Sequence, residues 1–206
     1  RKNLYNGHMT KLKVLVACEY SGLIRNAFAE KGHEAYSCDI LDTESPGNHI
    51  KDDVLNHLDK DWDLMIANPP CTHLAVSGAR WFKNKNKEQE LAIEFVKKLF
   101  NADIEKICIE NPVSVLSTQL RLPDQTVHPY YFGDPYQKKT CFWLKNLSKL
   151  VATHPLGPEP LFNKDADKGE FVNHGGKKMP KWYSNKERNR DMSFPGMAKA
   201  MADQWG

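Results

Sequence analysis

The fold of this chain is decided by residues 13–39, KVLVACEYSGLIRNAFAEKGHEAYSCD. The stretch opens with an apolar run rich in β-branched residues, 13–17, which is typical of a buried strand. Residues 23–31 then carry apolar side chains at helical spacing and are followed by Gly32, a common helix terminator. Residues 34–38 predict a second strand. Strand, helix and strand in this order predict the opening of a parallel α/β sheet, because parallel neighbours need a crossover connection.

The same alternation continues along the chain. Residues 53–58 predict a short helix, 63–67 a strand, 87–100 an amphipathic helix and 106–109 another strand. Alternating strands and helices predict a doubly wound, mostly parallel sheet of the Rossmann-like α/β class, which binds ligands beyond the carboxyl ends of its strands. We expect the core face of the long helix to be formed by Leu91, Ile93 (or Ala92), Phe95, Val96 and Leu99.

The last third of the chain has a different character. Residues 126–131 and 140–144 predict strands with no long helix between them, and residues 196–205 predict a closing helix. Residues 145–190 are rich in Pro, Gly, Lys and Asn, and we expect mostly loop there. We therefore divide the chain into a catalytic core, a loop-rich segment and a C-terminal helix that returns to the core: residues 9–144, 145–192 and 193–206.

The composition is that of an ordinary globular protein. Of 206 residues, 40% are hydrophobic and 27% are charged, and the formal net charge is +3. There is no apolar run long enough to cross a bilayer and no secretory signal, so we expect a cytoplasmic protein without a membrane partner. Residues 1–8 resemble the remnant of a protease-cleavable tag, so we expect the native chain to begin at Met9.

Five cysteines are present, and none belongs to a Cys-x-x-Cys pair. The histidines also lack metal-ligand spacing, so we expect no metal. The odd number of cysteines and the apolar surroundings of several fit reduced thiols in a cytosol-like compartment. A catalytic role for any one of them therefore has to come from its local setting.

Polar groups follow three of the predicted strands. Asp39 ends the second strand, where a carboxylate suits a pair of ribose hydroxyls, although a turn or helix cap explains it equally well. Residues 68–71, Asn-Pro-Pro-Cys, end the third strand, and the prolines hold the backbone so that Cys71 projects from a rigid turn. Glu110 ends the next strand at the same edge. A thiol and a carboxyl group on neighbouring strand ends are a candidate nucleophile and acid.

Four segments of this chain resemble, in family order, motifs of the DNA cytosine-C5 methyltransferases. Residues 63–78, DLMIANPPCTHLAVSG, resemble the Pro-Cys segment, and residues 109–112, IENP, resemble the Glu-Asn-Val segment. Residues 133–142, GDPYQKKTCF, resemble the Gln-x-Arg-x-Arg segment, and residues 193–200, SFPGMAKA, resemble the closing motif beside the cofactor. The resemblance implies the S-adenosylmethionine-dependent methyltransferase fold, S-adenosylmethionine as cofactor, and DNA as substrate.

The resemblance also implies a covalent mechanism. Cys71 would supply the thiolate that adds to C6 of cytosine, which makes C5 able to attack the methyl group of the cofactor. Glu110 would donate to N3 of the ring, and it works best if burial raises its pKa. Lys139 occupies the first arginine position of this segment, where the arginine of the family helps to bind the base that has left the DNA helix.

The resemblance assigns binding residues as well. Tyr20, Ser21 and Gly22 would line the methionine end of the cofactor, while Asp39 and Asp53 would lie near the ribose and the adenine. The further residues expected at the cofactor are Asn68, Pro69 and Ser193. A basic stretch at residues 177–190 interleaves cations with aromatic residues, which suits phosphates and stacked bases, although a solvated loop is the alternative. The residues expected at the nucleic acid are Arg80, Gln137, Lys177, Lys178, Lys181 and Trp182.

The chain departs from the family pattern in several places. Thr72 replaces the glutamine after the cysteine, and Cys141 occupies the second arginine position. Residues 18–22 lack the Gly-x-Gly-x-x-Gly pattern, so they are a weak nucleotide signal. Residues 145–190 are too few for a full base-reading region. Sequence specificity would then be low, supplied by a partner protein, or absent because the substrate is not duplex DNA.

Three other functions stay open. An amino-methyltransferase acting on exocyclic nitrogen also uses Asn-Pro-Pro at this strand end, but with an aromatic residue where this chain has Cys71. A C5-modifying enzyme for free pyrimidine nucleotides would need no base-reading region. A degenerate relative would bind DNA without turnover. A role in restriction–modification or in a phage, and the cytoplasm of a bacterial or phage-infected cell, follow from the family alone.

Overall fold

The computed structural model describes residues 10–75, 86–134, 138–154, 171–174, 177–180 and 194–206. Its strands are β1 (Lys13–Ala17), β2 (Glu34–Asp39), β3 (His49–Lys51), β4 (Leu64–Ala67), β5 (Lys106–Pro112), β6 (Gln125–Val127), β7 (Thr140–Lys145), β8 (Phe171–His174) and β9 (Lys177–Pro180). Its helices are α1 (Leu23–Glu30), α2 (Asn86–Phe100), α3 (Leu116–Gln119) and α5 (Pro195–Trp205), with 3-10 turns η1 (Val54–His57) and η3 (Pro129–Tyr131).

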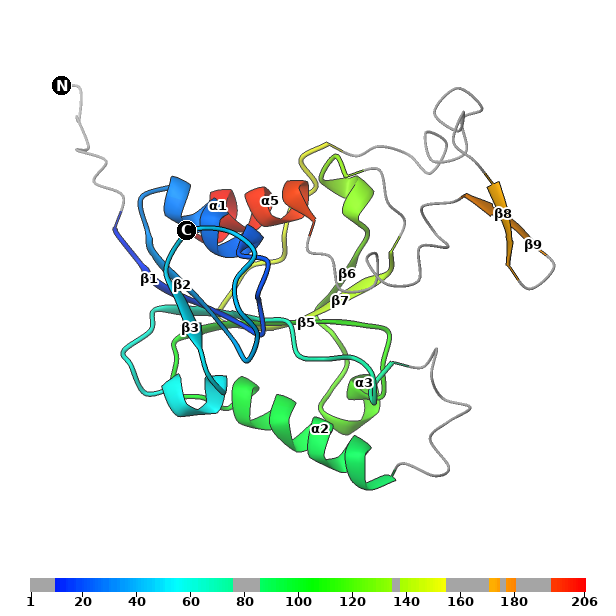
Figure 1. The fold of residues 1–206 in the computed structure, drawn as a ribbon, viewed down its shortest axis with the longest axis horizontal. Helices are drawn as coiled ribbons and strands as arrows, with labels where there is room; N and C mark the ends of the chain where they lie inside the picture. Colours follow the sequence, from blue (N-terminus) through cyan, green and yellow to red (C-terminus); the bar gives the residue numbers. More distant parts are fainter. Residues whose placement is uncertain (1–9, 76–85, 135–137, 155–170, 175–176, 181–193) are drawn as a thin grey trace.

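A seven-stranded sheet organises the molecule, in the order β3-β2-β1-β4-β5-β7-β6. The strands from β3 to β5 are parallel, and β7 is antiparallel to both β5 and β6. Helices α1 and α5 cover one face, and α2 and α3 lie on the other (Figure 1). The predicted class, a doubly wound and mostly parallel α/β sheet, is confirmed. The strand order reverses between β1 and β4, and such a switch point leaves a crevice at the carboxyl ends of the two strands.

Each face of the sheet has its own apolar core, because successive strand residues point to opposite sides. Val14 and Val16 of β1 belong to the cluster that contains Trp205 of α5. Leu15 belongs to the opposite cluster, with Leu99 of α2. A strand buried on both faces carries a continuous apolar run, which is why residues 13–17 could be predicted from the sequence.

One predicted strand is partly wrong. Residues 126–131 were expected to be extended, but β6 ends at Val127 and Pro129–Tyr131 form the 3-10 turn η3. Proline has no N–H to donate to a neighbouring strand, and its fixed φ suits the first turn of a helix. Pro129 therefore ends the strand early.

The predicted core face of α2 is correct in its main part and wrong at one end. Ile93, Val96 and Leu99 are buried, as expected. Leu91, by contrast, is 63% exposed and lies in the wall of the cavity described below. Phe95 is half-buried and lies in the same wall, so this flank of α2 faces the cavity.

Some elements were not predicted. β3 and α3 are three and four residues long, too short to show a period of either kind. The hairpin of β8 and β9 lies within residues 145–190, where mostly loop was expected. Residues 155–170 and 181–193 lie outside the described part of the chain, so the proposed division at residue 145 stays a prediction. Among the described residues, no helix is long and apolar enough to cross a membrane.

Candidate active site

A cavity of about 780 Å³ opens at the carboxyl ends of β1, β2, β4 and β5, where a doubly wound sheet binds its ligands. Its volume falls within the range of small-molecule sites. The strand-end residues of its wall include Cys18, Glu19, Tyr20, Ser21, Asp39, Ile40, Leu41, Asn68, Pro69, Pro70, Cys71, Glu110, Asn111 and Pro112. Side chains of η1, α2 and α5 complete the wall, including Asp53, Leu91, Phe95, Phe194 and Met197.

Cys71 lies in this wall, half-buried, at the start of the turn that follows β4. The backbone N–H of Asn68 donates to the carbonyl of Ala17 at 3.0 Å, which extends the pairing of β4 with β1 up to the two prolines. The carbonyl of Cys71 then accepts from Leu74 at 3.0 Å and from Ala75 at 2.9 Å. The thiol is therefore carried by a turn that is anchored on both sides.

Asn111 ties the end of β5 to this turn. Its side chain is 1% exposed, and its Nδ2 donates to the carbonyl of Pro69 at 3.0 Å. The bond needs a side chain that can donate, and the amide of Asn111 supplies that donor beside Glu110. The bond fixes the position of the Cys71 turn relative to the strand end that carries Glu110.

Glu110 lies in the same wall, on a strand that is buried along most of its length. Burial raises the pKa of this carboxyl group above its ordinary value, and the nearby cation of Lys138 opposes the shift without cancelling it. The carboxyl group therefore keeps its proton to a higher pH than an exposed glutamate would. A protonated carboxyl can act as a hydrogen-bond donor or a general acid.

Lys138 and Lys139 differ in their surroundings. Lys139, the residue expected in the site, is exposed and does not lie in the cavity wall. Lys138 is half-buried and does lie there, with its Nζ 5.6 Å from the ring centroid of Phe194. The two lysines immediately precede β7. Successive residues of a strand point to opposite faces of the sheet, so only one of two consecutive side chains can face the cavity.

Two other thiols in the wall are poor nucleophiles. Burial raises the pKa of Cys18 to about 12 and that of Cys38 to about 11, so both stay protonated near neutral pH. Cys108 and Cys141 are buried and do not lie in the wall. Their protonation and the positions of the other two therefore leave Cys71 as the candidate nucleophile among the cysteines.

The turn after β1 contains a buried carboxylate that sequence reasoning missed. Glu19 is 3% exposed and lies in the cavity wall. Its Oε1 accepts from the N–H of Ile24 at 2.7 Å and its Oε2 from that of Arg25 at 3.1 Å, which caps the start of α1. Its pKa is raised by burial, against the lowering effect of these bonds. Its position two residues after a buried strand, close to the rule applied to Asp39, was the available signal.

Tyr20 and Ser21 lie in the wall as expected, but Gly22 does not. Gly22 has a φ of 73° and directly precedes α1. A Cβ atom at this position would collide with the guanidinium of Arg25 and with the side chain of Ser45. The glycine therefore makes room for Arg25.

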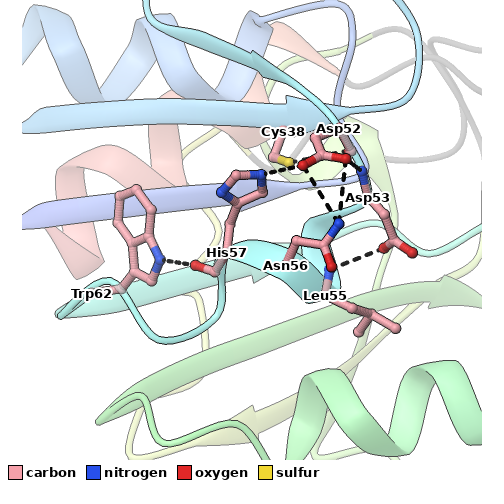
Figure 2. A network of polar contacts seen from close by, with 7 residues as sticks. All are labelled: Cys38, Asp52, Asp53, Leu55, Asn56, His57 and Trp62. Carbon is pink, nitrogen blue, oxygen red and sulfur yellow. Dashed lines mark hydrogen bonds and ion pairs between the residues drawn. The ribbon is translucent and has the colours of Figure 1, made fainter.

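Two acidic residues of the cavity wall, Asp39 and Asp53, also accept hydrogen bonds from nearby backbone N–H groups. Asp39 Oδ1 accepts from the N–H of Leu41 at 3.0 Å, in the turn after β2. Asp53 Oδ1 accepts from the N–H of Leu55 at 3.0 Å and caps η1 (Figure 2). Both residues lie in the cavity wall, so the turn or cap role and a ligand-facing position coexist.

A polar network holds the segment before η1 in place. Asp52 accepts from the backbone N–H of Asp53 at 2.7 Å and pairs with His57 Nε2 at 2.8 Å (Figure 2). The indole N–H of Trp62 donates to the carbonyl of His57 at 2.7 Å. The hydrogen bonds from His57 and from the backbone lower the pKa of Asp52. The network therefore fixes the backbone that carries Asp53 at the cavity wall.

Exposed aliphatic side chains border the cavity. Ile40 is 72% exposed, Leu41 52% and Leu91 63%, and all three belong to its wall. Exposed side chains of this kind beside carboxylates suit a ligand with an apolar ring and hydroxyl groups.

Several predicted site residues cannot be placed. Lys177 and Lys178 belong to β9, whose side chains are not described. The remaining ones lie outside the described residues: Ser193, Arg80, Gln137, Lys181 and Trp182. In the part of the chain that the structure describes, no group of three or more His, Cys, Asp or Glu residues is arranged to hold a metal ion.

Comparisons with known proteins add little. No protein-family model matches the chain, and no curated protein matches it either. Among solved structures, the chain is similar to one described as a DNA modification methyltransferase encoded within an E. coli prophage, at 15% identity and a TM-score of 0.45. The match covers 65% of this chain and spans 46% of the other.

Proposed function

We propose that this chain transfers a methyl group from S-adenosylmethionine to C5 of cytosine in DNA, with Cys71 as a covalent nucleophile. The observation that carries the proposal is the position of Cys71 and Glu110 in one cavity wall, at the carboxyl ends of the adjacent strands β4 and β5. Asn111 links these two strand ends directly. The motif resemblance to the cytosine-C5 methyltransferases supports the same assignment.

The cavity has features that fit the cofactor. Asp39 and Asp53 offer carboxylate oxygens for hydroxyl and amino groups, and Ile40 and Leu41 offer apolar surface beside them. Tyr20 and Ser21 line the adjoining turn after β1. When bound, S-adenosylmethionine supplies an electrophilic methyl group.

Each residue of the chain then has a defined task. The Cys71 thiolate forms a bond to C6 of the ring, and the electron pair of the C5–C6 double bond is delocalised toward N3. Glu110 donates its proton at N3, which its raised pKa favours. Lys138, whose charge lowers the pKa of Glu110, stabilises the negative charge that develops on the ring. After methylation, a water molecule takes the C5 proton, and the electron pair of the C5–H bond re-forms the C5–C6 double bond as the thiolate leaves. The proton on N3 returns to Glu110, which restores both the ring and the acid.

DNA as the acceptor rests on the sequence. A base in duplex DNA has to leave the helix to reach a cavity of this kind. The basic residues proposed to bind phosphate lie in residues 177–190. Replacing Lys177, Lys178 and Lys181 by alanine should weaken DNA binding and make the plot of log affinity against log salt less steep, by about one unit for each phosphate that is no longer neutralised. An unchanged slope would show that this segment does not bind phosphate.

The test is transfer of a labelled methyl group from S-adenosylmethionine to duplex DNA, single-stranded DNA, RNA and free deoxycytidine monophosphate. We expect label at C5 of cytosine in DNA, and none with the Cys71→Ser variant, whose affinity for S-adenosylmethionine should stay within about twofold of the parent. Label at an exocyclic nitrogen, or an active Cys71→Ser variant, would refute the proposed chemistry. Label on the free nucleotide alone would refute DNA as the substrate.

A further inference from the structure

Arg25 is a buried cation on the first turn of α1. Its side chain is 1% exposed, although it carries a charge at all relevant pH values. Burial of such a group is costly unless its N–H groups are hydrogen-bonded. The position of those bonds therefore indicates what Arg25 does in the fold.

The guanidinium of Arg25 binds the segment that joins β2 to β3. Nη2 donates to the carbonyl and the hydroxyl of Ser45, both at 2.9 Å, and to the carbonyl of Pro46 at 2.8 Å. Nη1 donates to Thr43 Oγ1 at 3.2 Å and to Ser37 Oγ at 2.9 Å. One side chain thus fastens residues 43–46 to α1 and to β2.

The same segment is bonded to the turn after β1. The N–H of Glu44 donates to the carbonyl of Tyr20 at 2.8 Å, and the hydroxyl of Ser45 donates to the carbonyl of Ser21 at 2.7 Å. Tyr20 and Ser21 lie in the cavity wall, and so do the residues at the start of the β2–β3 segment, Ile40 and Leu41. Two separate stretches of the cavity wall are therefore joined through residues 44–45.

Two glycines make this arrangement possible. A Cβ atom at Gly22 would collide with the guanidinium of Arg25, and one at Gly47 would lie within 2.7–2.9 Å of it. Both glycines have positive φ angles, 73° and 143°. The backbone on either side of the guanidinium is therefore shaped around it.

Glu19 links Arg25 to the cavity from the other side. Its carboxylate accepts the backbone N–H of Arg25 and attracts the buried guanidinium charge. Glu19 itself lies in the cavity wall. In the part of the chain that the structure describes, the acceptors of the guanidinium are neutral oxygens, so Glu19 supplies the nearby balancing charge.

We propose that Arg25 is a positioning residue of the cofactor site, which holds the turn after β1 and the segment after β2 in register so that together they bind S-adenosylmethionine. The proposal rests on the function proposed above and deepens it. It also explains how this chain builds a cofactor turn without the Gly-x-Gly-x-x-Gly pattern: a buried arginine fixes the turn from behind.

The test compares Arg25→Lys with Arg121→Lys in the full chain. Lysine keeps the charge but offers a single point of donation, so it cannot hold residues 37, 43, 45 and 46 together. Arg121 is the matched control, because its Nη2 binds Asp124 at 2.6 Å and the carbonyl of Leu144 at 2.9 Å, outside the cavity wall. Ser45→Ala is a milder second variant that removes the bond to Ser21.

Three quantities are measured. They are the hydrogen exchange of residues 40–48 without ligand, the affinity for S-adenosylmethionine by titration calorimetry, and the kcat of methyl transfer at saturating cofactor. We expect Arg25→Lys to speed exchange in this segment and to weaken binding about tenfold or more, and Ser45→Ala to do both to a smaller extent. At saturating cofactor, the kcat of both variants should stay within about threefold of the parent, because the chemical groups are untouched.

The outcomes separate the two proposals. Unchanged exchange in both variants would overturn the fastening role of Arg25. Faster exchange with unchanged affinity, or an equal loss of affinity in Arg121→Lys, would overturn its role in the cofactor site. A parent chain that binds no S-adenosylmethionine would refute the proposed function itself, so binding by the parent is measured before any variant is made. If Arg25→Lys does not fold, Ser45→Ala decides by the same criteria.

Discussion

The bond from Asn111 to Pro69 leads to a prediction about both stability and rate. Asn111→Ala removes the donor and leaves the buried carbonyl of Pro69 without this partner, at a cost of about 1–3 kcal/mol. Asn111 Oδ1 is buried without a hydrogen bond among the described residues, so its removal offsets part of this cost. We therefore expect a net loss of about 1–2 kcal/mol, which is a decrease of about 2–8 °C in Tm for a chain of this size.

The effect on rate should be larger than the effect on stability. Without the bond, the Cys71 turn is no longer fixed relative to Glu110, and a displacement of about 1 Å can lower the rate of the chemical step about 100-fold. We expect kcat for methyl transfer to fall by about 10- to 100-fold, measured at saturating cofactor and at a temperature where the variant is folded. The affinity for S-adenosylmethionine should change little, because Asn111 acts on the turn.

Gln125→Met is the control for this prediction. Gln125 on β6 exchanges amide–backbone bonds of 2.7 and 2.8 Å with Leu150, outside the cavity wall. The Gln125→Met variant should lose a similar free energy of unfolding and keep the kcat of the parent. If Asn111→Ala lost stability but kept the kcat of the parent, or if Gln125→Met lost as much rate, the reasoning that Asn111 positions Cys71 would be refuted.

Three further predictions concern charge. Lys138→Met removes the cation that lowers the pKa of Glu110, so the pKa of Glu110 should rise further. The decrease of kcat/KM at alkaline pH should then move to higher pH, and the maximum value of kcat/KM should fall about tenfold or more. Asp39→Ala should raise the Kd for S-adenosylmethionine about tenfold with little change in kcat, measured by calorimetry and initial rates. The pKa of Asp124 in the folded protein is lowered by Arg121 and by the N–H of Leu144, although burial opposes this shift. The ionised carboxylate therefore stabilises the fold above the ordinary carboxyl pKa, and this contribution is lost as the pH falls through the lowered pKa. Asp124→Asn should therefore make the decrease of Tm at acid pH less steep.

Two of these predictions have a matched control variant, and the third has a contradicting outcome. Lys139→Met changes the neighbouring, exposed lysine and should leave the pH profile unchanged; an equal effect of both lysines would contradict the structural distinction between them. Asp42→Ala removes an exposed carboxylate that pairs with Lys51 at 2.7 Å outside the cavity wall, and it should keep the Kd of the parent. For Asp124→Asn, an acid limb as steep as that of the parent would show that other carboxylates carry the effect.

Much of the fold could be predicted from local patterns. Residues 13–17 and 63–67 are mostly apolar runs, and a strand buried on both faces requires this. The helix at 87–100 carries a helical period over its whole length, and the structure begins it at Asn86. The assignment failed at Leu91 and at Pro129, because burial of a helix flank and the end of a strand depend on what packs beside them.

The position of the candidate catalytic residues also followed from the sequence. The carboxyl ends of parallel strands lie at one edge of the sheet, so polar residues at these strand ends were expected at the same edge. This argument places Asp39, Cys71 and Glu110 together, and the structure puts all three in one cavity wall.

The sequence by itself determined the α/β class of the sheet and the polar residues at its strand ends, because the hydrophobic period separates strands from helices and their alternation requires parallel pairing. The order of the strands was decided by the tertiary structure. Only the tertiary structure decided which side chains line the cavity: it placed Lys138 in the wall and not Lys139, and it added Glu19. It alone showed the bond from Asn111 to Pro69, across 42 residues, and the bonds of Arg25 to residues 43–46. Such contacts join segments far apart in the chain, and their geometry depends on packing that no local pattern encodes.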